Sequence, residues 1–185
     1  HITQQRWCAP LGYALAALTG YAALDAYTDL PLAAVVLLPL FLAAVAMAFI
    51  AWKRPAWGRL IFALNFLAAS IFNLVFLMED PSEYLYYAEF TMLESYRSFI
   101  LGPFSNHLVG YLGFISVAQF FIGLALLRRG PLLRWAALAG IFFLVAIAPI
   151  GFAAFPATLI LAVGMYFIYR RGNEQPLPLL RRKVA

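Results

Sequence analysis

Charged side chains are scarce in this chain of 185 residues, of which only 11% are Asp, Glu, Lys or Arg. An ordinary soluble domain is about 25% charged and about 45–50% apolar, whereas 65% of this chain is hydrophobic. A globule of this size cannot bury so many apolar side chains and still present a wettable surface. The composition therefore excludes a soluble enzyme and a nucleic-acid-binding protein, and it indicates a polytopic membrane protein.

Cysteine and histidine are almost absent as well. The single cysteine, Cys8, cannot form an intrachain disulfide, and two histidines, His1 and His107, are too few for a His/Cys metal cluster. The sequence also has no Gly-rich phosphate loop, nucleophile elbow or zinc motif. We therefore predict no metal site and no catalytic residues, which favours a role other than that of an enzyme.

Long apolar runs take up most of the chain. A hydrocarbon core of about 30 Å requires roughly 20 apolar residues in a helix, and a lone strand would leave its backbone groups unpaired in lipid. We therefore predict an all-α bundle of transmembrane helices that forms a single membrane domain over residues 1–185. Six runs fit, over residues 7–24, 30–51, 57–78, 108–127, 132–150 and 153–169.

The charges that are present alternate between the two sides of this six-helix arrangement. All but one of the 13 Lys and Arg residues fall on the side that holds both termini, and all but one of the 8 Asp and Glu residues fall on the other side. Cytoplasmic loops carry excess Lys and Arg, so we predict that both termini are cytoplasmic. A five-helix count would break this alternation. The expected location is a bacterial inner membrane.

Residues 79–106 form the one long connection, on the acidic side. Asp80-Pro81-Ser82-Glu83 is typical of a helix start, with Asp80 as the N-cap and Pro81 at the first helical position. The residues that follow place apolar and tyrosine side chains on one helical face. We predict one external amphipathic helix over residues 80–101 that lies in the outer membrane interface. It should end before Gly102-Pro103, and Ser105 or Asn106 should cap the next span.

A carboxylate lies on the edge of the apolar face of this predicted helix. Glu89 falls between Tyr96 and Ile100 in the helical projection, where a charged group needs a partner or a raised pKa. His107 begins the fourth span, where a histidine can hydrogen-bond a quinone carbonyl. Glu89, Tyr96 and His107, with Asn73 beneath them, are candidate ligands for a quinone or a bound lipid. The alternative is that Glu89 and His107 are ordinary interfacial residues in contact with water.

Small and amide side chains recur at helical spacing in three spans. Such stripes let membrane helices approach closely and hydrogen-bond to one another. They comprise Gly12, Ala16 and Gly20 in the first span, Asn65, Ala69 and Asn73 in the third, and Gly113, Ser116, Gln119 and Gly123 in the fourth. We predict that these residues serve helix packing, and a polar lining for a lipophilic ligand between the third and fourth spans is the alternative.

The end of the fourth span carries a pattern found in a known family. It reads Gln119-Phe120-Phe121-Ile122-Gly123-Leu124-Ala125-Leu126-Leu127-Arg128-Arg129-Gly130 and leads into residues 132–149. This stretch resembles the paired helices of small DoxX-like membrane proteins, in which a helix with a polar residue and a glycine precedes a short basic turn and another helix. The resemblance implies quinone or thiol redox chemistry. The family is described with four helices, and its polar residue is often acidic where this chain has Gln119.

Two functions are consistent with these patterns. The first is a non-catalytic integral membrane subunit or scaffold that packs against a larger membrane protein assembly or against itself, because no charged residue lies near the centre of a span. The second is a binder or redox partner of a lipophilic molecule, such as a quinone, at the outer mouth of the bundle. A small-solute transporter ranks below both, since Pro39 alone is weak evidence for the broken helices typical of transporters. The expected partners are the lipid bilayer and other membrane subunits, and no nucleic acid.

Overall fold

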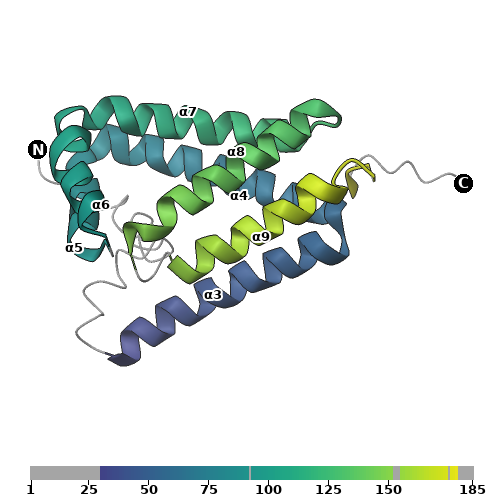
Figure 1. Ribbon diagram of the computed structural model, residues 1–185, viewed down its shortest axis with the longest axis horizontal. Helices are drawn as coiled ribbons and strands as arrows, with labels where there is room; N and C mark the ends of the chain where they lie inside the picture. The colour runs from purple at the N-terminus through teal and green to yellow at the C-terminus, as the bar shows by residue number, and fades with distance from the viewer. Residues whose placement is uncertain (1–29, 92, 152–154, 175, 179–185) are drawn as a thin grey trace, which may run out of the picture. The chain divides into compact units, whose positions relative to one another are not determined.

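The structure is a computed structural model that describes residues 30–91, 93–151, 155–174 and 176–178. The chain divides into two compact units, residues 1–43 and 44–185, and the packing described below is that of the second unit. The described residues are helical and contain no strand (Figure 1). This confirms the prediction of an all-α protein.

Five long helices lie within the described residues. They are α3 (Leu30–Lys53), α4 (Pro55–Glu79), α7 (Leu108–Leu126), α8 (Pro131–Ile147) and α9 (Phe155–Arg171), and a 3₁₀ turn, η4 (Ala148–Ile150), extends α8. Each coincides within a few residues with a predicted span. The predicted first span, over residues 7–24 with Gly12, Ala16 and Gly20, lies outside the described residues.

Three of these helices are long and apolar enough to cross a membrane. They are α4, α7 and the continuous stretch Pro131–Ile150, which joins α8 and η4. The apolar stretch Leu38–Lys53 of α3 is shorter, and α9 has 17 residues. The described chain is therefore consistent with a membrane protein, whereas the count of six spans and the side on which the termini lie stay predictions.

Proline marks the beginning of two of the helices that are able to cross a membrane, because it lacks an N–H group and its fixed φ suits the first helical turn. Pro55 begins α4 and Pro131 begins α8. Gly130, which precedes Pro131, has a φ of 81°, a conformation that glycine adopts readily and L-residues rarely adopt. The turn from α7 to α8 is therefore short and sharply defined.

The helices α4, α7, α8 and α9 form a closed ring, since α4 and α8 each pack against both α7 and α9 (Figure 1). Small residues permit the close contacts within it. A Cβ atom added at Gly123 would lie 2.8 Å from Leu67 Cγ, and one added at Gly164 would lie 2.7 Å from Phe62 Cζ. The largest apolar side chains that these contacts bury are Phe62, Phe66, Leu126, Leu133, Met165 and Ile168.

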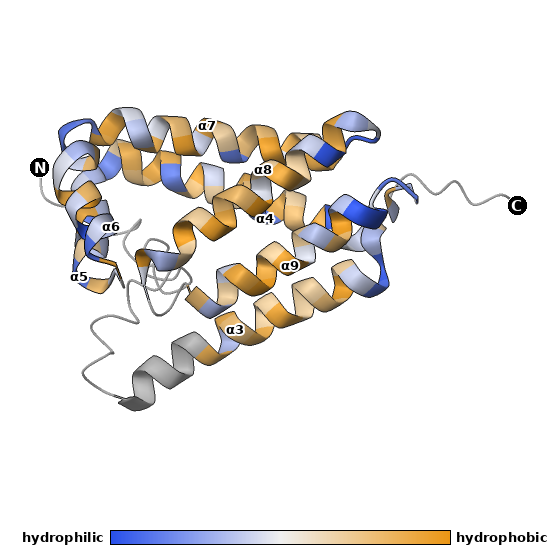
Figure 2. Cartoon of the chain, viewed as in Figure 1, coloured by the Kyte–Doolittle hydropathy of each residue, from blue (hydrophilic) through white to orange (hydrophobic). Residues whose placement is uncertain are grey.

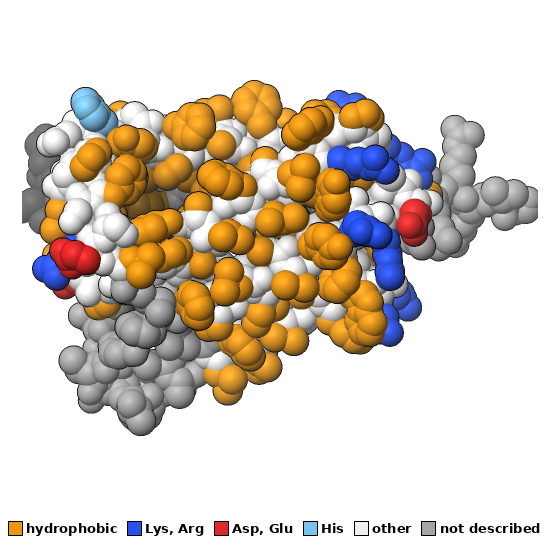
Figure 3. Space-filling view, in the orientation of Figure 1, with side chains coloured by type: hydrophobic (Ala, Val, Ile, Leu, Met, Phe, Trp, Pro, Cys, Tyr) orange, Lys and Arg blue, Asp and Glu red, His pale blue; other side chains and the backbone are white. Residues whose placement is uncertain are grey.

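Large apolar side chains also cover the outside of the ring. Phe142 and Phe114 expose 77% and 73% of their surface. The ribbons are mostly apolar along their middle (Figure 2), and on the face in Figure 3 apolar side chains cover the middle while Lys and Arg gather at one end. Contiguous apolar surface of this kind is rare on soluble monomers. It fits helices that lie in lipid or against other membrane helices.

The segment after α4 is not the single helix predicted over residues 80–101. It consists of η2 (Pro81–Tyr86), α5 (Tyr87–Phe90), α6 (Glu94–Phe99) and the π-helical turn η3 (Ile100–Phe104). Thr91 and Leu93, between α5 and α6, have extended backbones with ψ of 138° and 127°. The Thr91 hydroxyl donates to the Pro149 carbonyl at 2.9 Å, so a contact with the end of α8 fixes the break that helical periodicity does not show.

The sequence predicted the beginning of this segment correctly and its end wrongly. Asp80 does cap its beginning, since its carboxylate accepts from the Ser82 hydroxyl and, at 2.9 Å, from the Ser82 N–H. These two hydrogen bonds lower the pKa of Asp80. At the other end the prediction was wrong, because the backbone stays helical through Gly102 and Pro103 as η3. The N-cap of α7 is His107, while the Ser105 hydroxyl donates to the Leu101 carbonyl at 2.8 Å.

Candidate functional site

The four predicted ligand residues lie on four different elements. Glu89 on α5 and His107 at the start of α7 are exposed. Tyr96 on α6 is half-buried, and its hydroxyl donates to the Ala146 carbonyl at 2.8 Å. Asn73 is buried in α4. No hydrogen bond joins any two of them within the described residues, so a shared binding site stays a prediction.

A polar cluster, the Asn73 cluster, does form at the end of the bundle where α4 meets η2. The Asn73 side-chain N–H donates to Gln119 Oε1 of α7 at 2.6 Å, and Asn73 Oδ1 accepts from the hydroxyl of Tyr84 on η2. Asn73 and Gln119 are both buried, where an amide without a partner would be costly. These hydrogen bonds connect α4, α7 and η2.

One helical turn further along the α4–α7 contact, a second polar connection is made. The Ser70 hydroxyl donates to the Ser116 carbonyl at 2.7 Å, and the Ser116 hydroxyl donates to the Leu112 carbonyl of its own helix at 2.8 Å. The structure therefore places Ser116 and Gln119 between α4 and α7. Asn65, the third amide predicted to serve packing, is exposed on α4.

Tyr84 is the member of the Asn73 cluster that the sequence did not predict, because the predicted external helix placed its tyrosines only in the membrane interface. Its ring packs edge-on against Phe76, with centroids 5.8 Å apart. Burial, with a smaller contribution from Tyr87, raises the pKa of the Tyr84 phenol. The phenol is therefore protonated at neutral pH and donates to Asn73. The turn at Asp80 and Pro81 folds η2 back over α4, which a single straight helix would not do.

Arg59 is the central residue at the opposite end of the bundle. Its side chain has no solvent-exposed surface. Its Nε–H donates to the Leu126 carbonyl at 3.2 Å, and its Nη1–H donates to the Gly172 carbonyl at 2.9 Å. A third bond runs from Nη2 to the Arg128 carbonyl. The predicted third span, over residues 57–78, already contains Arg59, but the charge pattern counted this residue with the basic connection before the span, so its burial was not predicted.

The three acceptors explain why an arginine is buried there. Leu126 is the last residue of α7, and Gly172 directly follows α9. The last carbonyls of a helix have no partner within it and carry the negative end of its dipole. A guanidinium donates in several directions at once. Arg59 therefore ties the start of α4 to the ends of α7 and α9.

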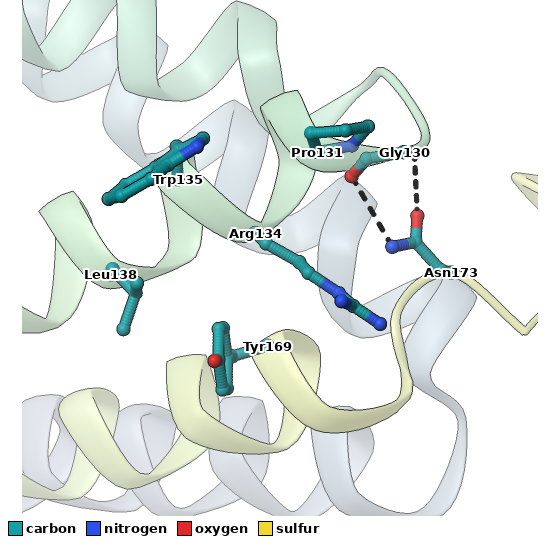
Figure 4. Close-up of a pocket in the computed structure, with 7 residues that line it drawn as sticks. All are labelled: Gly130, Pro131, Arg134, Trp135, Leu138, Tyr169 and Asn173. Carbon is teal, nitrogen blue, oxygen red and sulfur yellow. Dashed lines mark hydrogen bonds between the residues drawn. The ribbon is translucent and has the colours of Figure 1, made fainter.

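An open groove of about 460 Å³ lies beside Arg59's acceptors, between the start of α8 and the end of α9. Asn173 fixes its rim, because its Oδ1 accepts from the Gly130 N–H at 2.8 Å and its Nδ2 donates to the Gly130 carbonyl at 3.3 Å (Figure 4). The residues that line the groove are Gly130, Pro131, Arg134, Trp135, Leu138, Tyr169 and Asn173. Sequence reasoning did not identify this site, because it joins the start of α8 to the end of α9, and Gly130 and Asn173 lie 43 residues apart in the chain.

No group of three or more His, Cys, Asp or Glu residues that could hold a metal ion occurs in the described ranges. Comparison with protein-family models, with curated proteins and with solved structures finds no match for this chain. The resemblance to the DoxX-like proteins therefore stays a prediction, and the function has to be argued from the geometry.

Proposed function

We propose that this chain is a non-catalytic integral membrane subunit or scaffold, whose bundle packs against the transmembrane helix of another protein or of a second copy. The observation that carries the proposal is the exposed amide of Asn65. This residue lies near the middle of α4, one of the three helices able to cross a membrane. On the same helix, Leu64 and Ile71 expose 57% and 62% of their surface.

An amide in this place is unfavourable in lipid. Hydrocarbon offers no hydrogen-bond partner, so an unpaired amide there carries a desolvation cost. Amide side chains near the centre of membrane helices commonly hydrogen-bond across to another helix, which contributes roughly 0.6–2 kcal/mol. The exposed apolar residues of α4 also fit contact with a partner helix, because lipid and a partner helix accept apolar side chains equally.

The inner polar groups support the same proposal. The amides and hydroxyls that the ring buries join α4 to α7 and η2, and the buried guanidinium joins helix ends. These groups are occupied in holding the bundle together. Among the described amides of the predicted packing stripes, Asn65 is exposed, so it is placed to select a partner.

The test is extraction from the native membrane in a mild detergent at native abundance, followed by mass spectrometry of every protein and small molecule that travels with the chain. We expect a stoichiometric protein partner, or a second copy, with the unsubstituted chain. Asn65→Leu should lower the recovery of this partner several-fold. Asn65→Gln, which keeps an amide, and the matched control Ile71→Leu should leave the recovery of the partner unchanged.

Two results would overturn the proposal. The first is a chain that runs alone and monomeric. The second is a partner whose recovery is the same with Asn65→Leu. A lone chain that retains a quinone would favour the other function, a binder of a lipophilic molecule, and Glu89→Gln and His107→Ala would then be the variants with which to test ligand retention.

A further inference from the structure

The groove between α8 and α9 has a polar end and an apolar end. Arg134, Gly130 and Asn173 lie toward one end, and Trp135 and Leu138 lie toward the other (Figure 4). Its volume of about 460 Å³ is within the range of about 300–1,000 Å³ that is usual for small-molecule sites. An occupant that matches both ends has to be amphiphilic.

The polar end carries a positive charge that the described chain does not neutralise. Arg134 is exposed, and its guanidinium has no hydrogen-bond or ion-pair partner among the residues that the structure describes. The Asn173 amide is already bonded to Gly130 on both its oxygen and its nitrogen. Arg134 is therefore the positively charged donor among the residues that line the groove, and its charge favours an anion.

The surroundings add to this charge. Four more arginines lie in the turn before α8 or at the end of α9, namely Arg128, Arg129, Arg170 and Arg171. Lys and Arg side chains gather at this end on the face in Figure 3. Glu174 is the one carboxylate of this end within the described ranges. Basic clusters beside a membrane-spanning segment attract anionic lipids.

The groove also lies at the depth where a lipid changes from headgroup to acyl chain. Helix α8 begins at Pro131 and belongs to a stretch able to cross the membrane, so Arg134 lies one turn inside it and Leu138 lies two turns inside. Trp and Tyr, represented here by Trp135 and Tyr169, are typical of the membrane–water interface. Long arginine side chains in this position extend toward the headgroups.

We propose that this groove binds one anionic phospholipid, with its phosphate at the Arg134 guanidinium and an acyl chain along Trp135 and Leu138. A free phosphate ion matches only the polar end and leaves the apolar wall uncovered. An uncharged or zwitterionic lipid covers the wall but supplies no net negative charge to Arg134. This inference does not depend on the proposed function.

Trp135 provides a reporter within the groove. The full chain carrying Trp7→Phe, Trp52→Phe and Trp57→Phe keeps Trp135 as its one tryptophan. This single-tryptophan chain is reconstituted in phosphatidylcholine vesicles. In one series an increasing fraction of the lipid is brominated phosphatidylglycerol, and in a parallel series the same fraction is brominated phosphatidylcholine. Bromine quenches tryptophan on contact, so excess quenching by one lipid at equal mole fraction measures selective occupancy.

We expect brominated phosphatidylglycerol to quench Trp135 more than brominated phosphatidylcholine does. Arg134→Gln should lower this preference about tenfold, the loss expected when one charged hydrogen bond to a phosphate is removed. Arg134→Lys should keep most of it. The matched control is Arg170→Gln, which removes the same charge at the same end but does not line the groove, and it should have little effect.

Three results would overturn the inference. Equal quenching by the two brominated lipids would show that the groove does not select an anionic lipid. Equal losses with Arg134→Gln and Arg170→Gln would show general attraction to the surface. Loss of the excess quenching on addition of inorganic phosphate, but not of chloride at equal ionic strength, would show a site for a free anion.

Discussion

Replacing Arg59 by methionine is expected to lower the free energy of unfolding by about 3 kcal/mol. Each hydrogen bond to a charged group contributes about 1.5–3 kcal/mol, and Arg59 makes three to backbone carbonyls. The three do not add, and water reaches part of the vacated site because the Arg128 carbonyl lies in a turn. Removal of one partner from a buried, charged interaction costs about 3–5 kcal/mol, and we expect a loss of stability at the lower end of that range.

The assay is unfolding in mixed micelles of a mild detergent and increasing dodecyl sulfate, followed by circular dichroism. Arg59→Lys should recover part of the loss, because an ammonium keeps the charge but does not present donors to three separated carbonyls. Arg170→Met is the matched control. Arg170 is exposed and makes one long hydrogen bond, 3.5 Å, to the Tyr166 hydroxyl, so its removal should change stability by about 0.5 kcal/mol or less.

Hydrogen exchange provides a local measurement that a general loss of stability would not reproduce. In Arg59→Met, exchange should rise first at residues 127–130 and 172–174, where the carbonyl acceptors lie. If Arg59→Met unfolds at the same detergent composition as Arg170→Met, the buried guanidinium does not hold the ends of α7 and α9, and the reasoning is refuted.

Two further predictions concern the Asn73 cluster and the helix contacts. Because burial raises the pKa of Tyr84, the folded chain holds that proton more tightly than the unfolded chain, so stability should fall as the pH rises above about 10, the ordinary tyrosine pKa. Tyr84→Phe should lose about 1 kcal/mol at neutral pH and should show less of this alkaline decline in pH-dependent unfolding, whereas an unchanged decline would contradict the assignment. Gly164→Ala should cost about 1–3 kcal/mol, because its Cβ atom would lie 2.7 Å from Phe62 Cζ and 3.0 Å from Ala48 Cα. Gly110→Ala, which meets no atom within 4 Å, should be tolerated, and equal thermal stability of the two variants would refute the packing argument.

The bounds of the long helices could be predicted because hydropathy and proline act locally. The third predicted span, over residues 57–78, agrees with α4 to within two residues at its start and one at its end. The beginning of η2 was equally local, since Asp80 and Pro81 determine it by themselves. For such elements the sequence contains the physical cause of the structure within a few residues.

The candidate ligand set depended on an assumption that the structure contradicts. Glu89 and Tyr96 were placed on one face by assuming a continuous helix, and the extended residues Thr91 and Leu93 interrupt it. The cause is a hydrogen bond to Pro149, 58 residues away in the chain. Helical periodicity carries no information about such a contact, so the relative positions of Glu89 and Tyr96 could not be predicted.

Arg59 was missed for a similar reason. The excess of Lys and Arg in cytoplasmic loops counts an arginine at the start of a span with the connection that precedes it, so the charge pattern gave no reason to expect its burial. The acceptors of Arg59 follow it by 67, 69 and 113 residues. An arginine buried by helix ends from two distant segments can be recognised only when the packing of those segments is known. The groove that Arg134 lines could not be recognised from the sequence either, because its walls come from the start of α8 and the end of α9.

The most direct test of the central claim, that α4 packs against a partner through Asn65, is photo-crosslinking in intact native membranes. A benzophenone side chain is introduced in place of Ala68, an exposed residue one turn from Asn65 on α4, and, as a matched control, in place of Phe114, an exposed residue of α7. We expect one discrete adduct between position 68 and another protein or a second copy, a several-fold weaker adduct when Asn65→Leu is added, and no such adduct from position 114. Adducts at position 68 only with lipid or within the same chain would contradict the claim.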